Sequence, residues 1–318
     1  MSRHSTIREG LTYANGVLYE STGLYGESKV RQLDPQTGTV LLSKDLDSMY
    51  FGEGMAYVKG TMENNPMGNG NDILVQITWQ EKVGFVYDAD TLNRLYKFDF
   101  DTFTSEGWGI TYIPETQQLV VSDGSDWLHV WDVNRVNESS DGVYYFTELK
   151  RIQVHRSTGI TVNYINELEY VSGWILANIW YEDVIIRINP ETGLIEEEYD
   201  FQDLWPLGQR VNADCFNGIS IVGEGNATAS NGGVELYVTG KNWPTVYRVK
   251  ILGLQPNVIV VDSRKDITAA ASEAASLQDT MNNDSAKEDE AVESVECVSG
   301  GRCFEVLGTI PHDPTSFT

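Results

Sequence analysis

Gly10-Leu11-Thr12-Tyr13 opens a unit that recurs four more times along the chain. Each unit starts with a short strand pattern, and a second apolar strand follows it after a turn. The opening segments are Gly10–Tyr13, Gly54–Tyr57, Gly109–Tyr112, Glu167–Tyr170 and Gly218–Ile221; the second strands are Val17–Ser21, Ile73–Ile77, Leu119–Ser122, Ile175–Ile179 and Leu236–Thr239. Self-similarity at roughly 45–55 residues with several strands per unit is typical of a β-propeller. We therefore predict an all-β fold, a five-bladed β-propeller.

The repeat defines one domain and a tail. We expect the propeller to run over residues 7–252, with Asn134 to Tyr144 and Met62 to Asn71 as exposed loops. Residues 253–318 form an acidic tail rich in Ala, Ser, Asp and Glu, and its low hydrophobicity and high charge predict that it is mostly disordered. The segment Cys303 to Ile310 is more apolar, and the sequence assigns it no role.

The charge of the chain limits its partners. A formal net charge of −25 excludes nucleic acid as a partner, because a phosphate backbone needs a basic footprint. It also disfavours anionic membrane surfaces, and no segment approaches the roughly 20 apolar residues of a membrane span. The N-terminal residues Met1 to Arg8 carry no signal peptide, whereas sequons at Asn137, Asn226 and Asn283 favour the secretory route.

The chain has three cysteines. Cys215 stands alone and is expected to be a small buried residue. Cys297 and Cys303 bracket a flexible span that could close as a local disulfide in an oxidising compartment, and the sequence leaves open whether they pair.

The repeat also predicts where a site lies. In a propeller blade the first strand is innermost and the second runs antiparallel to it, so the start of the first and the end of the second meet at one face. The residues just before the opening strands are Glu9, Glu53, Trp108, Asn166 and Asn217, and those just after the second strands are Thr22, Trp79, Asp123, Trp180 and Lys241. We expect these side chains to surround one mouth of the central channel.

These residue types suit a small polar ligand with an apolar stem. Indoles provide a desolvated wall, a carboxylate within it acquires a raised pKa that suits acid–base work, and a lysine or amide can donate to a carbonyl oxygen that gains charge. Each also has a purely structural interpretation, since tryptophans pack blades and Lys241 could pair with a neighbouring acid. Four scattered histidines exclude an obvious Ser-His-Asp triad or histidine zinc site.

Several of these segments resemble the plant-type glutaminyl cyclases, or glutamine cyclotransferases. The resemblance covers about residues 7–252, and its motifs are Glu20–Gly26, Tyr50–Gly54, Asn166–Tyr170, Ala177–Trp180, Phe216–Ile219 and Val238–Pro244. The family's fold, a five-bladed propeller, agrees with the five units. The resemblance implies conversion of the N-terminal glutamine of a peptide or protein into pyroglutamate with release of ammonia.

The resemblance also implies roles for residues. Glu53 matches the catalytic acid/base, and Asn166 and Lys241 match residues that bind and polarise the reacting amide. The aromatic pocket corresponds to Phe51, Trp79, Trp108 and Trp180, with Glu9 and Asn217 beside it. No metal is required, although the channel could hold a structural calcium, and the family resemblance implies a secreted protein that we expect to be a monomer.

Two positions depart from the family pattern, and two other functions stay open. The family opens its first blade with Phe-Thr-Gln-Gly-Leu, where this chain has Ile7-Arg8-Glu9-Gly10-Leu11. A second carboxylate at Glu9 favours a cationic amine and raises the pKa of Glu53. The alternatives are a non-catalytic propeller that binds peptides or proteins at this mouth, and a metal-dependent hydrolase or lactonase with Glu9, Glu53, Asn166 and Asn217 around one ion.

Overall fold

The computed structural model describes residues 7–61, 70–222, 233–252, 254 and 304–311. These residues form twenty strands, and the one helical element among them is the short 3-10 turn η1, Leu207–Gln209. The prediction of an all-β fold is confirmed. None of the helical structure in the described ranges is long and apolar enough to cross a membrane.

The strands follow one another as antiparallel meanders. The first sheet contains β1 (Ile7–Ala14), β2 (Val17–Gly23), β3 (Lys29–Leu33) and β4 (Val40–Asp45). The second contains eight strands: β5 (Gly52–Val58), β6 (Ile73–Thr78), β7 (Val83–Asp88), β8 (Arg94–Asp99), β9 (Ile110–Ile113), β10 (Gln118–Ser122), β11 (Trp127–Glu138) and β12 (Tyr144–Gln153). Its two meanders join at their outer strands through one parallel bridge between Phe98 and Tyr144.

Two further meanders complete the fold. One contains β13 (Ile165–Val171), β14 (Trp174–Ile179), β15 (Val184–Ile188) and β16 (Ile195–Asp200). The other contains β17 (Phe216–Ile221), β18 (Gly233–Gly240), β19 (Thr245–Leu252) and β20 (Phe304–Pro311). Every predicted opening and second strand therefore lies within an observed strand, except that β9 begins at Ile110, one residue after the predicted start at Gly109.

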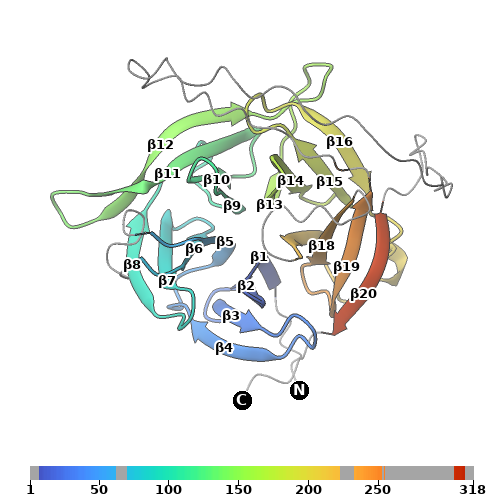
Figure 1. The fold of residues 1–318 in the computed structure, drawn as a ribbon, viewed down its shortest axis with the longest axis horizontal. Coiled ribbons are helices and arrows are strands. Elements are labelled where there is room, and N and C mark those ends of the chain that lie inside the picture. The colour runs from blue at the N-terminus through green and yellow to red at the C-terminus, as the bar shows by residue number, and fades with distance from the viewer. Residues whose placement is uncertain (1–6, 62–69, 223–232, 253, 255–303, 312–318) are drawn as a thin grey trace, which may run out of the picture. The chain divides into compact units, whose positions relative to one another are not determined.

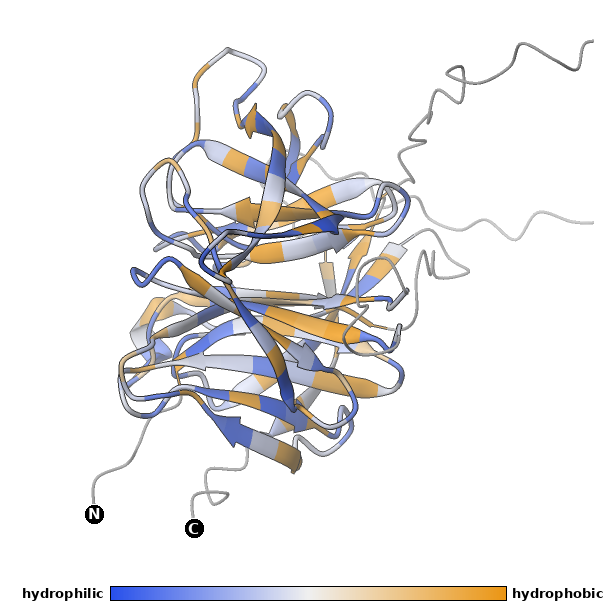
Figure 2. Ribbon diagram, turned by 90° about the vertical axis from the view of Figure 1, so that its left-hand side faces the viewer, coloured by the Kyte–Doolittle hydropathy of each residue, from blue (hydrophilic) through white to orange (hydrophobic). Residues whose placement is uncertain are grey.

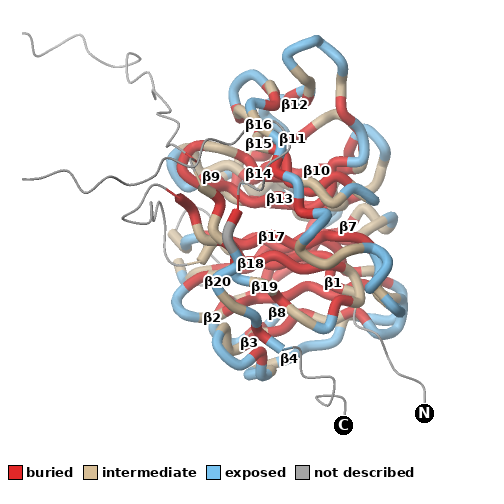
Figure 3. Tube along the Cα trace, turned by 90° about the vertical axis from the view of Figure 1, so that its right-hand side faces the viewer, coloured by how far each residue is buried: buried red, intermediate tan, exposed pale blue. Residues whose placement is uncertain are grey.

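The first strands of the meanders lie at the centre. Figure 1 shows β1, β5, β9 and β13 facing a common middle, with β4, β8, β12, β16 and β20 at the rim, and contacts place β17 between β13 and β1. Each first strand contacts the next one: β1 contacts β5, β5 contacts β9, β9 contacts β13, and β13 contacts β17. The cycle closes because β17 also contacts β1. These central strands are buried along most of their length, as the red segments of Figure 3 show. The apolar segments, orange in Figure 2, lie mainly within the sheets. The core therefore lies between neighbouring sheets.

Glycines allow the central strands to approach each other closely. A β-carbon on Gly10 would lie 2.5 Å from Met55 N, one on Gly54 would lie 2.7 Å from Trp108 O, and one on Gly109 would lie 2.1 Å from Asn166 O. No side chain fits at such distances, so the recurring glycine is a packing requirement. The fourth unit has Glu167 at this position, and its carboxylate accepts a hydrogen bond from Leu11 N at 3.1 Å.

The turns after the third strands β3 and β15 are held by side-chain hydrogen bonds to the backbone. Asp34 Oδ1 accepts from the backbone N–H groups of Gln36 and Thr37, and Asn189 Oδ1 accepts from those of Glu191 and Thr192. In the first of these turns Gly38 has a φ of 71°, which is the left-handed conformation that glycine adopts without strain.

The predicted tail requires a correction. Residues Phe304–Pro311 lay in the expected tail, but they form β20, which pairs antiparallel with β19 and is the fourth strand of the last sheet. Their apolar side chains explain this, because Phe304 stacks on Phe201 at 4.2 Å and Ile310 packs among Leu11, Leu18 and Leu33. The domain boundary at residue 252 thus leaves out one strand.

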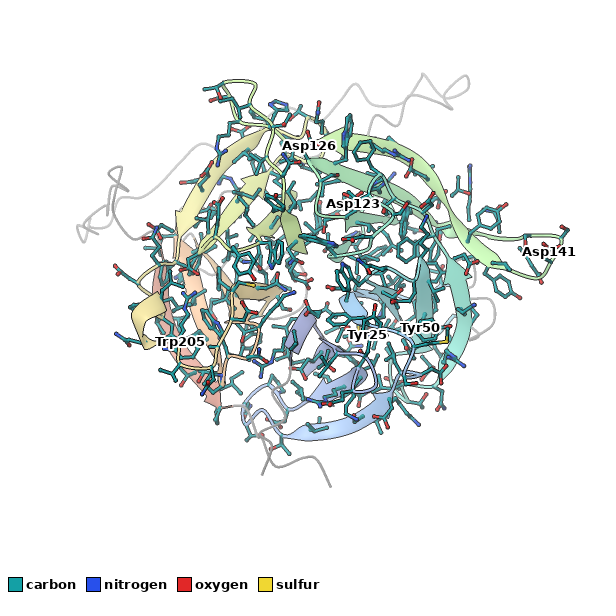
Figure 4. All side chains as sticks on the ribbon, turned by 180° about the vertical axis from the view of Figure 1, so that it is seen from behind. Tyr25, Tyr50, Asp123, Asp126, Asp141 and Trp205 are labelled. Atoms are coloured by element: carbon teal, nitrogen blue, oxygen red, sulfur yellow. The ribbon has the colours of Figure 1, made fainter. Side chains whose placement is uncertain are left out.

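Two other expectations are affected by the observed structure. The expected loop from Asn134 to Tyr144 is mostly a hairpin, because β11 continues to Glu138 and β12 begins at Tyr144; Asp141 lies at its peripheral tip (Figure 4). Most of the loop from Met62 to Asn71, the sequons at Asn226 and Asn283, residues Cys297 and Cys303, and the acidic stretch 255–303 lie outside the described residues. Cys215 is buried and unpaired, as predicted.

The substitution Gly109→Ala tests the close approach of the central strands. The added methyl group would overlap the Asn166 carbonyl, so we expect the variant to lose about 1–3 kcal/mol of unfolding free energy, measured by urea denaturation. Gly208→Ala is the matched control, because nothing lies within 4 Å of its β-carbon position. Equal stability of the two variants would contradict the packing argument.

Candidate functional site

Irregular pairing turns several side chains toward one mouth of the ring. The pairing register of the central strands shifts between Arg8 and Gly10, Gly52 and Met55, Ile165 and Leu168, and Phe216 and Ile219. The residues in these shifts include Glu9, Glu53, Asn166 and Asn217, which are the polar residues predicted from the sequence. A β-bulge of this kind redirects a side chain and is common beside active sites.

Backbone hydrogen bonds join the two sets of predicted positions. Trp79 N donates to Phe51 O at 3.0 Å, Trp180 N to Tyr164 O at 2.8 Å, and Lys241 N to Cys215 O at 2.9 Å. In each case the residue after a second strand lies beside the segment that precedes an opening strand. The expectation that strand starts and strand ends share one face is confirmed for these units.

Glu9, Glu53 and Lys241 form a buried charged cluster. Lys241 Nζ lies 2.5 Å from Glu9 Oε2, and all three residues are largely withdrawn from solvent. Burial raises the pKa of Glu53 well above its usual value, and the adjacent Glu9 carboxylate raises it further. Burial lowers the pKa of Lys241, but Glu9 and Glu53 outweigh this effect and hold that pKa above its ordinary value.

The ion pair decides which carboxyl group holds the proton. Burial also raises the pKa of Glu9, but the Lys241 ammonium opposes this shift at close range. We therefore assign the negative charge to Glu9 and the titrating proton to Glu53, which shares a hydrogen bond with Glu9. Lys241 does pair with a neighbouring acid, as its structural interpretation suggested, and that acid lines the same mouth.

Two buried amides at this mouth have free hydrogen-bonding groups. Among the described residues, no donor reaches Asn166 Oδ1, and neither polar atom of the Asn217 amide has a partner. Both residues are at most 2% exposed. Buried polar atoms are rarely left unpaired in native proteins, and those that are usually await a ligand or water. The two amides therefore indicate a binding site for polar groups.

A carboxylate fixes two of the indoles. Glu106 Oε2 accepts hydrogen bonds from Trp79 Nε1 at 3.0 Å and from Trp108 Nε1 at 2.9 Å. Its other oxygen accepts from Gln80 Nε2 at 2.9 Å. Because the rings are tied to one acceptor, they stand as a preformed pair of walls rather than as mobile side chains.

Further ring contacts extend these walls on both sides. Phe51 packs edge-on against Trp79 with ring centroids 5.6 Å apart, and Tyr25 packs against Phe51 at 5.5 Å. On the other side Trp108 contacts Trp180 at 5.4 Å. The predicted aromatic residues Phe51, Trp79, Trp108 and Trp180 are therefore brought together, and Tyr25 lies towards the middle of the ring in Figure 4.

A hollow lies next to the cluster of Glu9, Glu53 and Lys241. Its volume is about 270 Å³, and its lining includes Tyr181, Leu207, Asp214 and Cys215. Asp214 N donates to Lys241 O at 2.8 Å, and the Tyr181 ring lies 4.5 Å from that of Trp180. The mouth thus continues into a partly apolar depression on the side of β14 and β17.

Sequence reasoning missed three participants. Glu106 and Tyr25 lie in connections outside the repeated strands, so the repeat gave no sign of them. Arg8 is buried beside Glu9, and its Nε lies 2.5 Å from Glu20 Oε1. Arg8 and Glu9 both differ from the family pattern Phe-Thr-Gln-Gly-Leu. This departure was the one sign in the sequence that the contacts around Arg8 differ from those of the family.

Within the ranges that the structure covers, no group of three or more His, Cys, Asp or Glu side chains is arranged to hold an ion. Glu9, one of the carboxylates at this mouth, is bound to Lys241. Because calcium also binds amide and backbone carbonyl oxygens, the structural calcium considered from the sequence stays a prediction.

Comparison with known proteins agrees with this geometry. The sequence model of the glutamine cyclotransferase family matches residues 3–251. The chain belongs to the glutamine cyclotransferase family. The glutaminyl-peptide cyclotransferase of Arabidopsis thaliana is 31% identical over 245 residues, which cover 76% of this chain and 66% of the plant protein. Slightly less than two thirds of the plant protein therefore has a counterpart here.

A solved structure supports the same assignment. The crystal structure of Myxococcus xanthus glutaminyl cyclase matches with a TM-score of 0.59 and 28% sequence identity. The match covers 77% of this chain and 90% of the bacterial one. The family's fold therefore extends over most of the described residues of this cyclotransferase family member.

The variant Glu106→Ala tests the preformed aromatic walls. Loss of two charge-assisted hydrogen bonds should release both indoles. For a glutamine-initiated dipeptide, the substrate class that we propose below, we expect the KM to rise about tenfold with little change in kcat. Glu138→Ala, at an exposed position on the β11 hairpin, is the control. An unchanged KM in a folded Glu106→Ala protein would show that the carboxylate is not needed to hold the walls.

Proposed function

We propose that this chain is a glutaminyl-peptide cyclotransferase, which converts the N-terminal glutamine of peptides or proteins into pyroglutamate and releases ammonia. The observation that carries the proposal is a buried carboxyl group, Glu53, which shares a hydrogen bond with Glu9 of the Glu9–Lys241 ion pair. Family membership supports the same reaction, since the Arabidopsis relative bears that activity in its name.

The proposed reaction closes a five-membered ring. The α-amine of the substrate, in its neutral form, attacks the carbonyl carbon of its own side-chain amide, and a new N–C bond forms. The tetrahedral intermediate then collapses, the bond from that carbon to the amide nitrogen breaks, and ammonia leaves. Because the reacting groups belong to one residue, the main task of the aromatic walls is to hold the reactive rotamer.

Glu53 would move the proton in this reaction. Its carboxylate accepts a proton from the attacking amine and returns it to the departing nitrogen, a role that contributes about 10²–10⁴-fold to the rate of such reactions. The raised pKa of Glu53 suits this task, because a group that titrates nearer to neutrality can both accept and donate.

Lys241 and Asn166 would stabilise the oxyanion. Lys241 has more than one N–H group, so it can donate to the substrate oxygen while it remains paired with Glu9. Asn166 has no partner at its Oδ1 within the described residues, which suits that atom to accept from the substrate amine while the amide N–H group donates. Loss of one such donor typically costs roughly 3 kcal/mol.

The wider organisation is also part of the proposal. We propose that the five meanders are the blades of a five-bladed propeller, supported by the closed cycle of contacts among the five first strands. We further propose a monomer that acts without a metal ion and follows the secretory route, supported by the family resemblance and the sequon at Asn137.

The variant Glu53→Gln tests the proton transfer. We expect ammonia release from a glutamine-initiated dipeptide to fall at least 100-fold, because the amide cannot accept a proton. Activity is followed by coupled ammonia detection, with and without chelator, and folding is checked by near-UV circular dichroism. Turnover retained by a folded Glu53→Gln protein would remove Glu53 from the mechanism, and chelator-sensitive turnover of the unmodified protein would favour a metal-dependent hydrolase.

The variant Glu9→Gln tests the coupling of the two carboxyl groups. The charge of Glu9 raises the pKa of Glu53, so its removal should lower that pKa. Because the carboxylate form of Glu53 begins the reaction, the acidic limb of the pH profile of kcat/KM should move to lower pH. The same substrate is used throughout, so its amine pKa does not change, and the exposed variant Glu196→Gln is the control. A shift to higher pH would contradict the assignment of charge to Glu9.

A further inference from the structure

A larger cavity lies at the opposite end of the central strands. Its volume is about 410 Å³, and it is lined by residues near the ends of β1, β5, β9, β13 and β17, whereas Glu9 and Glu53 lie near the starts of β1 and β5. The fourth position of the sequence repeat supplies much of the lining: Tyr13, Tyr57, Tyr112, Tyr170 and Ile221. The cavity is therefore separate from the cluster around Glu53.

One carboxyl group distinguishes this cavity from ordinary packing. The repeat position before each of these residues holds small side chains, Thr12, Ala56, Thr111 and Ser220, but in the fourth unit it holds Glu169. Glu169 is 7% exposed and lines the cavity. Its Oε1 accepts from Ile221 N at 2.7 Å, and no other hydrogen bond to it is found among the described residues, so its second oxygen is a free acceptor.

The aromatic walls stay neutral at physiological pH. Burial raises the pKa of Tyr112 to about 12, and burial likewise raises the pKa of Tyr170. The nearby Glu115 carboxylate raises both pKa values further, so an acidic group lies beside these two rings. Neutral tyrosine rings next to a carboxylate form the kind of wall that attracts a cation.

The one cationic side chain in the lining already has acidic neighbours. Lys59 is 72% exposed, and its Nζ lies 3.5 Å from Asp72 Oδ2. Asp72 also accepts a hydrogen bond from the Tyr57 hydroxyl. Within the part of the chain that the structure covers, the buried carboxyl group of Glu169 therefore has a backbone N–H group as its hydrogen-bond partner and no cationic one.

We propose that this cavity binds a small organic ammonium ion, with Glu169 as counter-ion and the tyrosine rings as walls. A volume of about 410 Å³ accommodates an alkylammonium group such as a quaternary amine. Burial raises the pKa of Glu169 to about 8, and a bound cation would offset this cost of ionisation. The net charge of −25 adds long-range attraction for such ligands.

Isothermal titration calorimetry with tetramethylammonium chloride tests the proposal on the full chain at constant ionic strength. We expect saturable binding of one ion, and binding of the neutral tert-butanol, which is similar in size, at least tenfold weaker. Glu169→Gln keeps an acceptor for Ile221 N–H but removes the charge, and it should weaken binding of the cation at least tenfold. The control Glu196→Gln removes an exposed charge elsewhere and should leave the affinity unchanged.

A second pair of variants keeps the test decisive if Glu169→Gln does not fold. Tyr112→Phe retains the ring and should bind like the unmodified protein, whereas Tyr112→Leu should bind about threefold more weakly. The proposal is overturned by an absence of saturable binding to the unmodified protein, by equal affinity for tert-butanol, or by undiminished binding to both folded Glu169→Gln and Tyr112→Leu. None of these readouts depends on the cyclisation reaction.

Discussion

The first strands of the five meanders meet with almost no side-chain volume between them, and the rest of the structure depends on this close contact. At Gly10, Gly54 and Gly109 the neighbouring backbone occupies the space that a β-carbon would need. Where the fourth unit has Glu167, the carboxylate reaches the backbone of β1 and bonds to Leu11 N. The middle of the ring is therefore narrow, and the side chains of the candidate site and of the cavity beside Glu169 gather at its two ends, where bulges and strand ends give them room.

The candidate site combines two buried carboxyl groups with one ammonium group. Glu9 and Lys241 neutralise each other at 2.5 Å, which leaves Glu53 as the group whose proton can move. The family pattern that the sequence resembles has a glutamine at the position of Glu9, so this chain has a charged group where that pattern has a neutral one. The Lys241 ammonium is thereby held by a partner, and its position is more strongly fixed than that of a free lysine.

Much of this arrangement could be predicted from the sequence, because strand periodicity and a repeat fix which residues share a face. The gathering of Glu9, Glu53, Asn166, Asn217 and the aromatic residues followed from the antiparallel order of each unit. The register shifts themselves were not visible, since they depend on pairing between strands. Glu106 was missed because it lies in a connection with no counterpart in other units. Strand β20 was missed because about 50 residues of acidic sequence separate it from β19. Such a long connection is compatible with pairing, because the entropy cost of closing a loop grows only slowly with its length.

Strand β20 shows that the acidic sequence before it lies between two paired strands of the last sheet. Because Phe304–Pro311 returns to pair with β19, and Ile310 packs among side chains of the first sheet, the stretch that precedes it is an insertion between adjacent strands and not a free terminus. Both of its ends are anchored in the folded ring. Proteolytic cleavage within the insertion would therefore leave two polypeptides held together by the pairing of β19 with β20, as a nicked two-chain protein.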